Sequence, residues 1–197
     1  MTRLVLASGS PARLRLLTEA GFAPEAVASG VEEDGVTAPT LPELVVALAE
    51  AKAAAVAGRP EVAGAVVVGC DSLLDVDGDV HGKPQSIEEA RARLSRLRGR
   101  RAVLRTGHCV IDTSTGRRAT GVAATEVRFG WYTDGELEAY LATGEALDAA
   151  GSFTLDGRSA PFVDGIVGDH SNVIGLSLPL FRSLLGELGL TVMDLWA

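Results

Sequence analysis

The stretch LASGSPARLRLL, Leu6–Leu17, is predicted to join a short apolar strand to a helix that begins at Pro11. Ser10 is the expected N-cap, and proline at the first helical position loses no hydrogen bond. The backbone N–H groups at such a junction lie at the positive end of the helix, which favours a bound phosphate or carboxylate. Arg13 in the first turn opposes the helix dipole, so either a bound anion or solvent must stabilise it. For this stretch alone, a capped helix with a solvated arginine is the more common arrangement, so the later residues decide.

Strand and helix patterns alternate along the rest of the chain and include a hairpin turn at Asp77-Gly78. This mixed order predicts an α/β or α+β fold with a mixed sheet, not a doubly wound one. The expected strands are 4–6, 25–29, 65–74, 101–113 and 118–129, and the expected helices are 11–17, 41–57, 87–97, 134–143 and 178–188. Residues 150–170 are rich in Gly, Ser and Asp, with a short apolar segment at 161–163, and a buried turn is expected at 172–176.

Length and composition limit the possible classes of protein. The 197 residues fit one domain, or one domain of two lobes, and 47% hydrophobic residues are enough for a core. The net charge of −8 argues against nucleic acid and against an anionic membrane as partners. We expect a cytoplasmic protein, because the sequence has neither a long apolar segment nor a signal-peptide pattern. Cys70 and Cys109 are predicted to be two isolated thiols.

Charged residues interrupt two apolar patterns. Lys52 falls on the apolar stripe of the helix predicted over 41–57, which Thr40 caps. It either extends along apolar surface to the rim, the more common reason, or points at a group inside a cleft. Asp71 interrupts the apolar run of the strand predicted over 65–74, where a carboxylate needs partners.

The helix that follows Ser86 carries four arginines. Ser86 and Glu89 are expected to form a capping box, and Ile87, Ala90, Leu94 and Leu97 to be buried. We expect the arginines to be solvated, since they are scattered over the polar side and the C-terminal end. They are Arg91, Arg93, Arg96 and Arg98.

Polar residues that break the local pattern recur near the ends of separate elements, and together they supply three cations, two carboxylates and a loop of backbone N–H groups. This set suits hydrolysis of a polyphosphate, because cations and N–H groups neutralise phosphate oxygens, and carboxylates hold a divalent metal or take a proton from water. Scattered surface charge on an unrelated α/β protein is the alternative. The residues are Ser8, Ser10, Arg13, Glu33, Lys52, Asp71 and Lys83.

Several segments resemble the Maf family of nucleoside triphosphate pyrophosphatases, in the family's order from residue 4 to about 185. They are LASGSPARLRLL, Glu32-Glu33, ALAEAKA, VVVGCDS, GKP and NVIGL. The resemblance implies one Maf-like domain over residues 1–197, with a two-lobed α/β fold, a mixed sheet and a central cleft, similar to the inosine triphosphate pyrophosphatases. It also implies hydrolysis of a nucleoside triphosphate, pyrimidine or modified, to the monophosphate and pyrophosphate.

The resemblance further implies roles for individual residues. Asp71 would be the proton acceptor and, with Glu33, a ligand of a divalent metal (Mg²⁺, Mn²⁺ or Co²⁺). The implied substrate contacts are Ser8, Gly9, Ser10, Arg13, Lys52 and Lys83. The positions implied to set base specificity are Ala12, Ser72 and Asp156, and all three differ from the usual residues of the family. The preferred base is therefore not assigned.

The family was named for septum formation, which gives a second hypothesis: a nucleotide-binding regulator of cell division without significant turnover. The carboxylate of Asp71 favours the enzyme, because a binder of nucleotides has no need of a proton acceptor. The resemblance also implies a possible homodimer.

Overall fold

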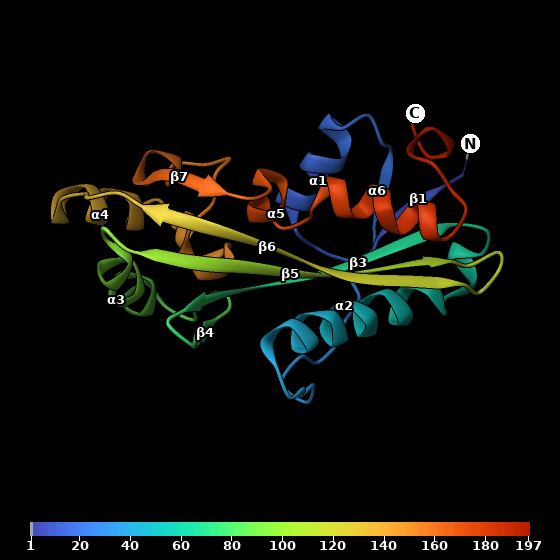
Figure 1. Ribbon diagram of the computed structural model, residues 1–197, viewed down its shortest axis with the longest axis horizontal. Coiled ribbons are helices and arrows are strands. Elements are labelled where there is room, and N and C mark those ends of the chain that lie inside the picture. The colour runs from blue at the N-terminus through green and yellow to red at the C-terminus, as the bar shows by residue number, and fades with distance from the viewer. Residues whose placement is uncertain (1) are drawn as a thin grey trace. The chain divides into compact units, whose positions relative to one another are not determined.

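The computed structural model describes residues 2–197, over which the chain forms seven strands and six α-helices (Figure 1). The predicted mixed α/β fold is confirmed. The strands are β1 (Leu4–Leu6), β2 (Pro24–Ala26), β3 (Val66–Val76), β4 (Asp79–His81), β5 (Arg101–Asp112), β6 (Arg118–Phe129) and β7 (Val163–Val167). The helices are α1 (Pro11–Glu19), α2 (Leu41–Ala57), α3 (Ile87–Leu97), α4 (Asp134–Leu141), α5 (His170–Ile174) and α6 (Leu178–Glu187).

The strands form a mixed sheet in the order β2-β1-β3-β5-β6-β7, with β4 paired to β3. Strand β1 is parallel to both β2 and β3, whereas the β3–β4 and β6–β7 pairs are antiparallel. Leu6 is level with Val68 in the register of β1 and β3. The loop that leaves β1 therefore begins beside the part of β3 that leads to Asp71.

The chain divides into two compact units. The first contains the described residues up to Asp71, together with Thr106–Ala123 and Gly175–Ala197, and the second contains Ser72–Arg105 and Ala124–Ile174. Strands β3, β5 and β6 contribute residues to both units. Each unit has its own hydrophobic core. The single domain with two lobes around a cleft stays a prediction.

In the first unit, helix α2 packs directly on strands β3 and β5 because two glycines leave room for it. A Cβ atom on Gly69 would lie 2.5 Å from the carbonyl oxygen of Ala49, and one on Gly107 would lie 2.0 Å from that of Val45. Helix α6 lies on the opposite side of the strands from α2 (Figure 1), where Gly121 of β6 faces Leu180. The two helices thus sandwich this part of the sheet.

In the second unit, aromatic side chains fill the space around helices α3 and α4. The rings of Phe129 and Phe153 meet edge to face at 4.8 Å, and those of Tyr132 and Tyr140 contact Phe162 at 4.7 and 5.7 Å. Burial raises the pKa of Tyr132 to about 12, and its hydroxyl donates to the carbonyl oxygen of Leu94. Such aromatic pairs contribute beyond their buried area, so this core is well specified.

Helix caps follow the sequence predictions with one correction. The side chains of Ser10, Thr40 and Ser86 accept from the backbone N–H three residues on, and Thr40 with Glu43 forms a full capping box. The reciprocal bond predicted for Glu89 is wrong, because its carboxylate accepts from the backbone N–H of Gln85 instead of that of Ser86. The Glu89 carboxylate also forms an ion pair with Arg93, one turn later in α3.

Three element predictions also need correction. Residues 163–167 form strand β7 inside the Gly-, Ser- and Asp-rich region, where no strand was predicted, because backbone pairing with β6 orders a segment of weak pattern. Residues 170–174 form the short helix α5 where a buried turn was expected. The second strand spans 24–26 and not 25–29.

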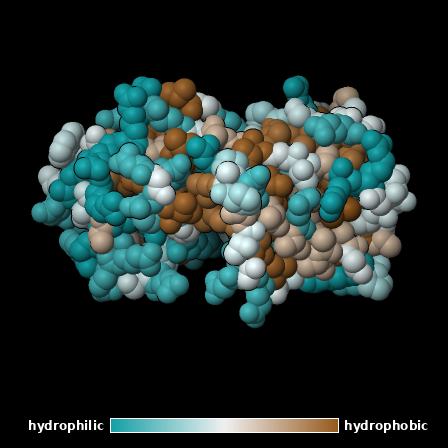
Figure 2. Space-filling model, turned by 60° about the horizontal axis from the view of Figure 1, so that its bottom comes forward, coloured by the Kyte–Doolittle hydropathy of each residue, from teal (hydrophilic) through white to brown (hydrophobic). Residues whose placement is uncertain are grey.

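On the face shown in Figure 2, hydrophilic residues alternate with exposed hydrophobic ones. Within residues 2–197, no helix has both the length and the apolar character needed to span a membrane.

Candidate active site

A buried lysine joins two carboxylates in the first unit. The ammonium group of Lys52, on α2, lies 2.6 Å from Oδ1 of Asp71, on β3, and 2.7 Å from Oε1 of Glu33, in the loop before α2. Lys52 and Asp71 are buried, while the side chain of Glu33 is half-exposed. Of the two possible arrangements for Lys52, the inward one is therefore present.

Close packing of α2 on β3 makes this contact possible. Gly69 lies two residues before Asp71, and its missing Cβ leaves room for the backbone at Ala49 and Ala53, which flank Lys52 along α2. A larger residue at position 69 would hold the helix farther from the strand. The length of the Lys52–Asp71 contact thus depends on a glycine outside the charged group.

The two carboxylate oxygens of Asp71 differ in their hydrogen bonding. Oδ1 accepts from Lys52, whereas Oδ2 is buried and has no hydrogen-bond partner anywhere in residues 2–197. An unsatisfied buried acceptor of this kind costs about 1–3 kcal/mol. Natural proteins seldom retain such a cost without use, and a carboxylate oxygen in this state is ready to accept a proton or to coordinate a cation.

The loop after β1 is built around the hydroxyl of Ser8. This hydroxyl accepts from the backbone N–H of Ser10 at 3.1 Å and from Nη1 of Arg13 at 3.3 Å. The hydroxyl of Ser10 accepts from the backbone N–H of Arg13, as the predicted N-cap requires. A Cβ on Gly9 would meet nothing within 4 Å, so the loop is open above this residue. The predicted phosphate-binding loop therefore has an accessible backbone.

Arg13 is half-buried and is anchored to a backbone carbonyl, which neither alternative from the sequence anticipated. Its Nε donates to the carbonyl oxygen of Gly175 at 2.7 Å. Gly175 has a φ of +123°, and a Cβ there would lie 3.1 Å from the same Nε. Only glycine fits this conformation and this approach without strain. Gly175 is a site residue that sequence reasoning missed, although it lies in the NVIGL segment.

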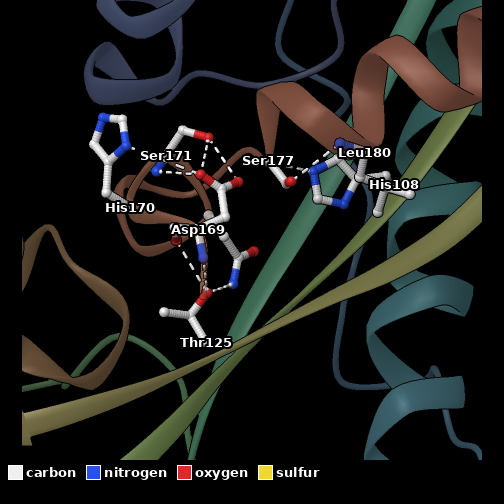
Figure 3. A network of polar contacts seen from close by, with 8 residues as sticks. His108, Thr125, Asp169, His170, Ser171, Ser177 and Leu180 are labelled. Carbon is white, nitrogen blue, oxygen red and sulfur yellow. Dashed lines mark hydrogen bonds and ion pairs between the residues drawn. The ribbon is translucent and has the colours of Figure 1, made fainter. Parts of the chain in front are cut away.

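A buried histidine holds the segment that follows Gly175 (Figure 3). Nε2 of His108 accepts from the backbone N–H of Ser177 at 2.8 Å, and Nδ1 faces the carbonyl oxygen of Thr106 at 3.0 Å. This pattern requires a neutral ring with its proton on Nδ1. Ser177 in turn caps α6 through Leu180. The ring and the cap together fix the chain next to the Arg13 anchor.

Three charged side chains of this unit affect the pKa of one buried thiol, that of Cys70. Burial raises the pKa of Cys70 to about 12, while the charge of Arg13 lowers it, that of Asp71 raises it and that of Lys52 lowers it. Arg13, Asp71 and Lys52 are thus each within electrostatic range of Cys70. Cys70 and Cys109 are both free thiols, as predicted.

The donor set is sparse for a metal but compatible with one. No group of three or more His, Cys, Asp or Glu side chains within residues 2–197 is arranged to hold a metal ion. Asp71 nevertheless has an unpartnered buried oxygen, and Glu33 is half-exposed beside it on the same ammonium. Mg²⁺ often uses only one or two protein carboxylates together with substrate phosphates, so these two residues fit that kind of site.

The remaining predicted site residues are distributed over both units. Ala12 lies in α1 of the first unit and is half-buried. Ser72 is half-buried, Lys83 and Asp156 are exposed, and all three belong to the second unit. Thr154 donates a hydrogen bond to Asp156. The approach of Lys83 to Asp71 stays a prediction, as do the specificity roles.

One of the four arginines of α3 is buried, contrary to expectation. The side chain of Arg93 is 4% exposed, compared with 40% for Arg91 and 58% for Arg96. The solvated state predicted for Arg93 is therefore wrong. The periodic pattern of α3 failed here because an arginine can occupy the core when it pairs with a carboxylate, as Arg93 does with Glu89. Its Nε nevertheless has no hydrogen-bond partner within residues 2–197.

Two other features of the second unit lack the geometry or the residues of the proposed active site. Asp169, His170 and Ser171 contain the residue types of a hydrolytic triad, but the Ser171 hydroxyl donates to both oxygens of Asp169, as in a capped turn (Figure 3). His170 is largely exposed, with Nδ1 3.9 Å from Asp169. A pocket of about 450 Å³ between α3 and α4 has none of the predicted site residues in its lining.

Comparison with known proteins shows to which family this chain belongs. The model of the Maf-like protein family matches residues 3–188, so the chain belongs to this family. Proteins from Streptomyces coelicolor and Streptomyces avermitilis, each named nucleoside triphosphate pyrophosphatase, are 63% and 60% identical to it. The matches cover 99% and 98% of this chain and 95% and 94% of those proteins. A protein of the same name from Salinispora tropica is 48% identical over 99% of this chain and 88% of its own length.

Proposed function

We propose that this protein hydrolyses nucleoside triphosphates to nucleoside monophosphates and pyrophosphate. The observation that carries the proposal is the buried Lys52–Asp71 pair, in which one carboxylate oxygen is held by the ammonium group and the other has no partner in residues 2–197. The relatives that match nearly the whole chain are named for this activity, which supports the same conclusion.

In the proposed reaction, Oδ2 of Asp71 takes a proton from a water molecule that attacks the α-phosphorus. Lys52 donates to Oδ1 and so fixes the orientation of the carboxylate. The new bond joins the water oxygen to the α-phosphorus, and the bond from that phosphorus to the bridging oxygen breaks. Its electron pair leaves with pyrophosphate, and Asp71 then returns its proton to solvent.

The loop after β1 would bind phosphate oxygens. The open backbone at Gly9, the positive end of α1 and the guanidinium group of Arg13 are all suited to an anion. The hydroxyl of Ser8 already accepts from Arg13, so its own hydrogen is directed elsewhere and can be donated to a phosphate. Lys83 would add a cation from the second unit.

Glu33 and Asp71 would hold a divalent metal together with the phosphates of the substrate. When bound, such an ion supplies positive charge that neutralises the phosphate oxygens during attack. Lys52 contacts both carboxylates and compensates part of their negative charge.

Replacement of the proton acceptor tests the proposal. We expect Asp71→Asn to lower kcat by about 10²–10⁴-fold, the usual contribution of a positioned base. The amide can still accept from Lys52, so folding should be retained. Asp75→Asn makes the same change farther along β3. It should keep full activity, because Asp75 pairs at 3.6 Å with Arg105, which is not one of the proposed site residues. Release of pyrophosphate by Asp71→Asn at the wild-type rate would show that another residue is the base.

The same preparation separates the enzyme from the alternative, a nucleotide-binding regulator of septum formation. A regulator would bind nucleotide without release of pyrophosphate, with or without Mg²⁺, Mn²⁺ or Co²⁺. A panel of pyrimidine, purine and modified triphosphates would identify the preferred base and test the specificity roles of Ala12, Ser72 and Asp156. Cytoplasmic location and a homodimer stay predictions.

A further inference from the structure

Arg93 makes more contacts from its buried position than helix packing requires. Nη1 donates to the carbonyl oxygen of Gly82 at 2.7 Å and to the hydroxyl of Ser152 at 3.1 Å, and Nη2 donates to Oε1 of Glu89 at 2.6 Å. The guanidinium group thus joins its own helix to two segments that are far apart in the sequence. All of these residues belong to the second unit.

The burial of this charge is costly, which argues for a specific use. Replacing a buried ion pair by apolar residues of similar volume is often neutral or stabilising. A methionine or leucine would therefore serve α3 at least as well if only core packing mattered. Exposed arginines on the same helix, such as Arg96 with its partner Asp79, carry no such cost.

The two segments held by Arg93 also bond to each other. The carbonyl oxygen of Gly82 accepts a second hydrogen bond, from the backbone N–H of Gly151 at 3.1 Å. Ser152 has a φ of +70°, which is strained for a residue with a side chain, and Tyr140 donates to its carbonyl oxygen at 3.1 Å. A strained serine persists here because the surrounding bonds hold it.

The carbonyl group of Gly82 is part of the peptide unit that leads into Lys83. Two donors on this oxygen fix the plane of that peptide, and Pro84 restricts the backbone on the other side of Lys83. The exposed side chain of Lys83 therefore starts from a rigid base, although it lies in a loop after β4.

We propose that Arg93 is a positioning residue, which locks the turn at Gly82 to the segment at Ser152 and so holds Lys83 ready for the triphosphate. The inference rests on the proposed function, in which Lys83 contacts phosphate. Without the lock, the turn would have to be ordered when substrate binds, and that ordering would weaken binding. The chemical step would be little affected, because Arg93 touches none of the proposed reacting groups.

Steady-state kinetics on Arg93→Met test this role. Ordering about one further residue on binding corresponds to roughly a tenfold rise in KM, and kcat should stay within about twofold of the wild type. Arg93→Lys keeps the charge but cannot form the same fork, so we expect partial rescue with a smaller rise in KM. Arg96→Met, the same change at an exposed position of α3, should leave both constants unchanged.

A double-mutant cycle separates positioning from a general structural effect. In a Lys83→Ala background there is no lysine left to position, so Arg93→Met should add little to the rise in KM. Hydrogen exchange gives a readout without substrate: backbone amides at 82–83 and 151–153 should exchange faster in Arg93→Met. If that variant does not fold, Ser152→Ala removes one contact of the guanidinium group, and a smaller rise in KM that vanishes with Lys83→Ala is expected.

Each outcome decides between the two proposals. An unchanged KM in folded Arg93→Met, or effects that simply add in the double variant, would overturn the inference while Lys83→Ala still raises KM. If Lys83→Ala itself leaves KM unchanged, the phosphate role of Lys83 is wrong, and the inference falls with that part of the proposed function.

Discussion

Substitution of Gly69 by alanine should weaken both the fold and the active site, although Gly69 carries no reactive group. A Cβ at this position would lie 2.5 Å from the carbonyl oxygen of Ala49, 2.7 Å from the backbone nitrogen of Ala53 and 2.9 Å from its Cβ. These are backbone atoms or atoms fixed to the backbone, so no side-chain rotation relieves the overlap. Helix α2 would have to retreat by about 1 Å to restore ordinary contact.

The cost can be estimated from this overlap. Overpacking costs about 1–3 kcal/mol, and a clash with a helix backbone belongs at the upper end of that range. For a chain of this length, about 3 kcal/mol corresponds to a fall in Tm of roughly 6–12 °C. The retreat of α2 also lengthens the 2.6 Å contact between Lys52 and Asp71, so kcat should fall as well.

Thermal unfolding and pyrophosphate release should be measured on the same samples of Gly69→Ala. Gly186→Ala is the matched control, since a Cβ on Gly186 meets nothing within 4 Å. Gly186 lies in α6, where alanine is favoured by up to about 1 kcal/mol, so this variant should be neutral or slightly stabilised. A Gly69→Ala protein with wild-type Tm and kcat would refute the claim that close packing of α2 sets the lysine–aspartate contact.

Further predictions concern the ion pair, the arginine anchor and a buried thiol. Lys52→Met leaves the buried Asp71 without its main partner, so urea unfolding should show a loss of about 3–5 kcal/mol; a loss under 1 kcal/mol would contradict the burial of the pair. Gly175→Ala crowds Nε of Arg13 and forces a strained φ, so we expect a destabilisation of about 1–3 kcal/mol with a higher KM, and an unchanged KM would argue against the anchor. Burial raises the pKa of Cys70 to about 12, so at pH 8 the folded protein should react with a maleimide only after denaturant is added. Fast labelling of the native protein would contradict the burial of this thiol. Because the unfolded thiol ionises near pH 9 and the folded one does not, the free energy of unfolding due to this group should fall as pH rises from about 9 to 12.

The sequence was informative where local chemistry decides structure. The caps at Ser10 and Thr40, the apolar run of β3 and the hairpin turn at Asp77-Gly78 all depend on neighbouring residues, and all are present. Strand β7 depends instead on pairing with β6, which no pattern within 163–167 reveals.

The site was predictable in its charged residues but not in the groups that hold them. Lys52 and Asp71 could be selected because each breaks an apolar pattern, and the structure brings them together. Arg93 looked like an ordinary surface arginine, since two of its three acceptors, Gly82 and Ser152, lie 11 and 59 residues away in the sequence. The contact between Gly175 and Arg13 could not be predicted either, because the two residues are 162 positions apart in the sequence.

The most direct test of the central claim is hydrolysis of a nucleoside triphosphate in water enriched in ¹⁸O, followed by mass analysis of both products. Attack at the α-phosphorus with Asp71 as the base predicts one ¹⁸O atom in the monophosphate, unlabelled pyrophosphate, and almost no product from Asp71→Asn. Label in pyrophosphate, release of orthophosphate alone, or undiminished turnover by the variant would contradict the account.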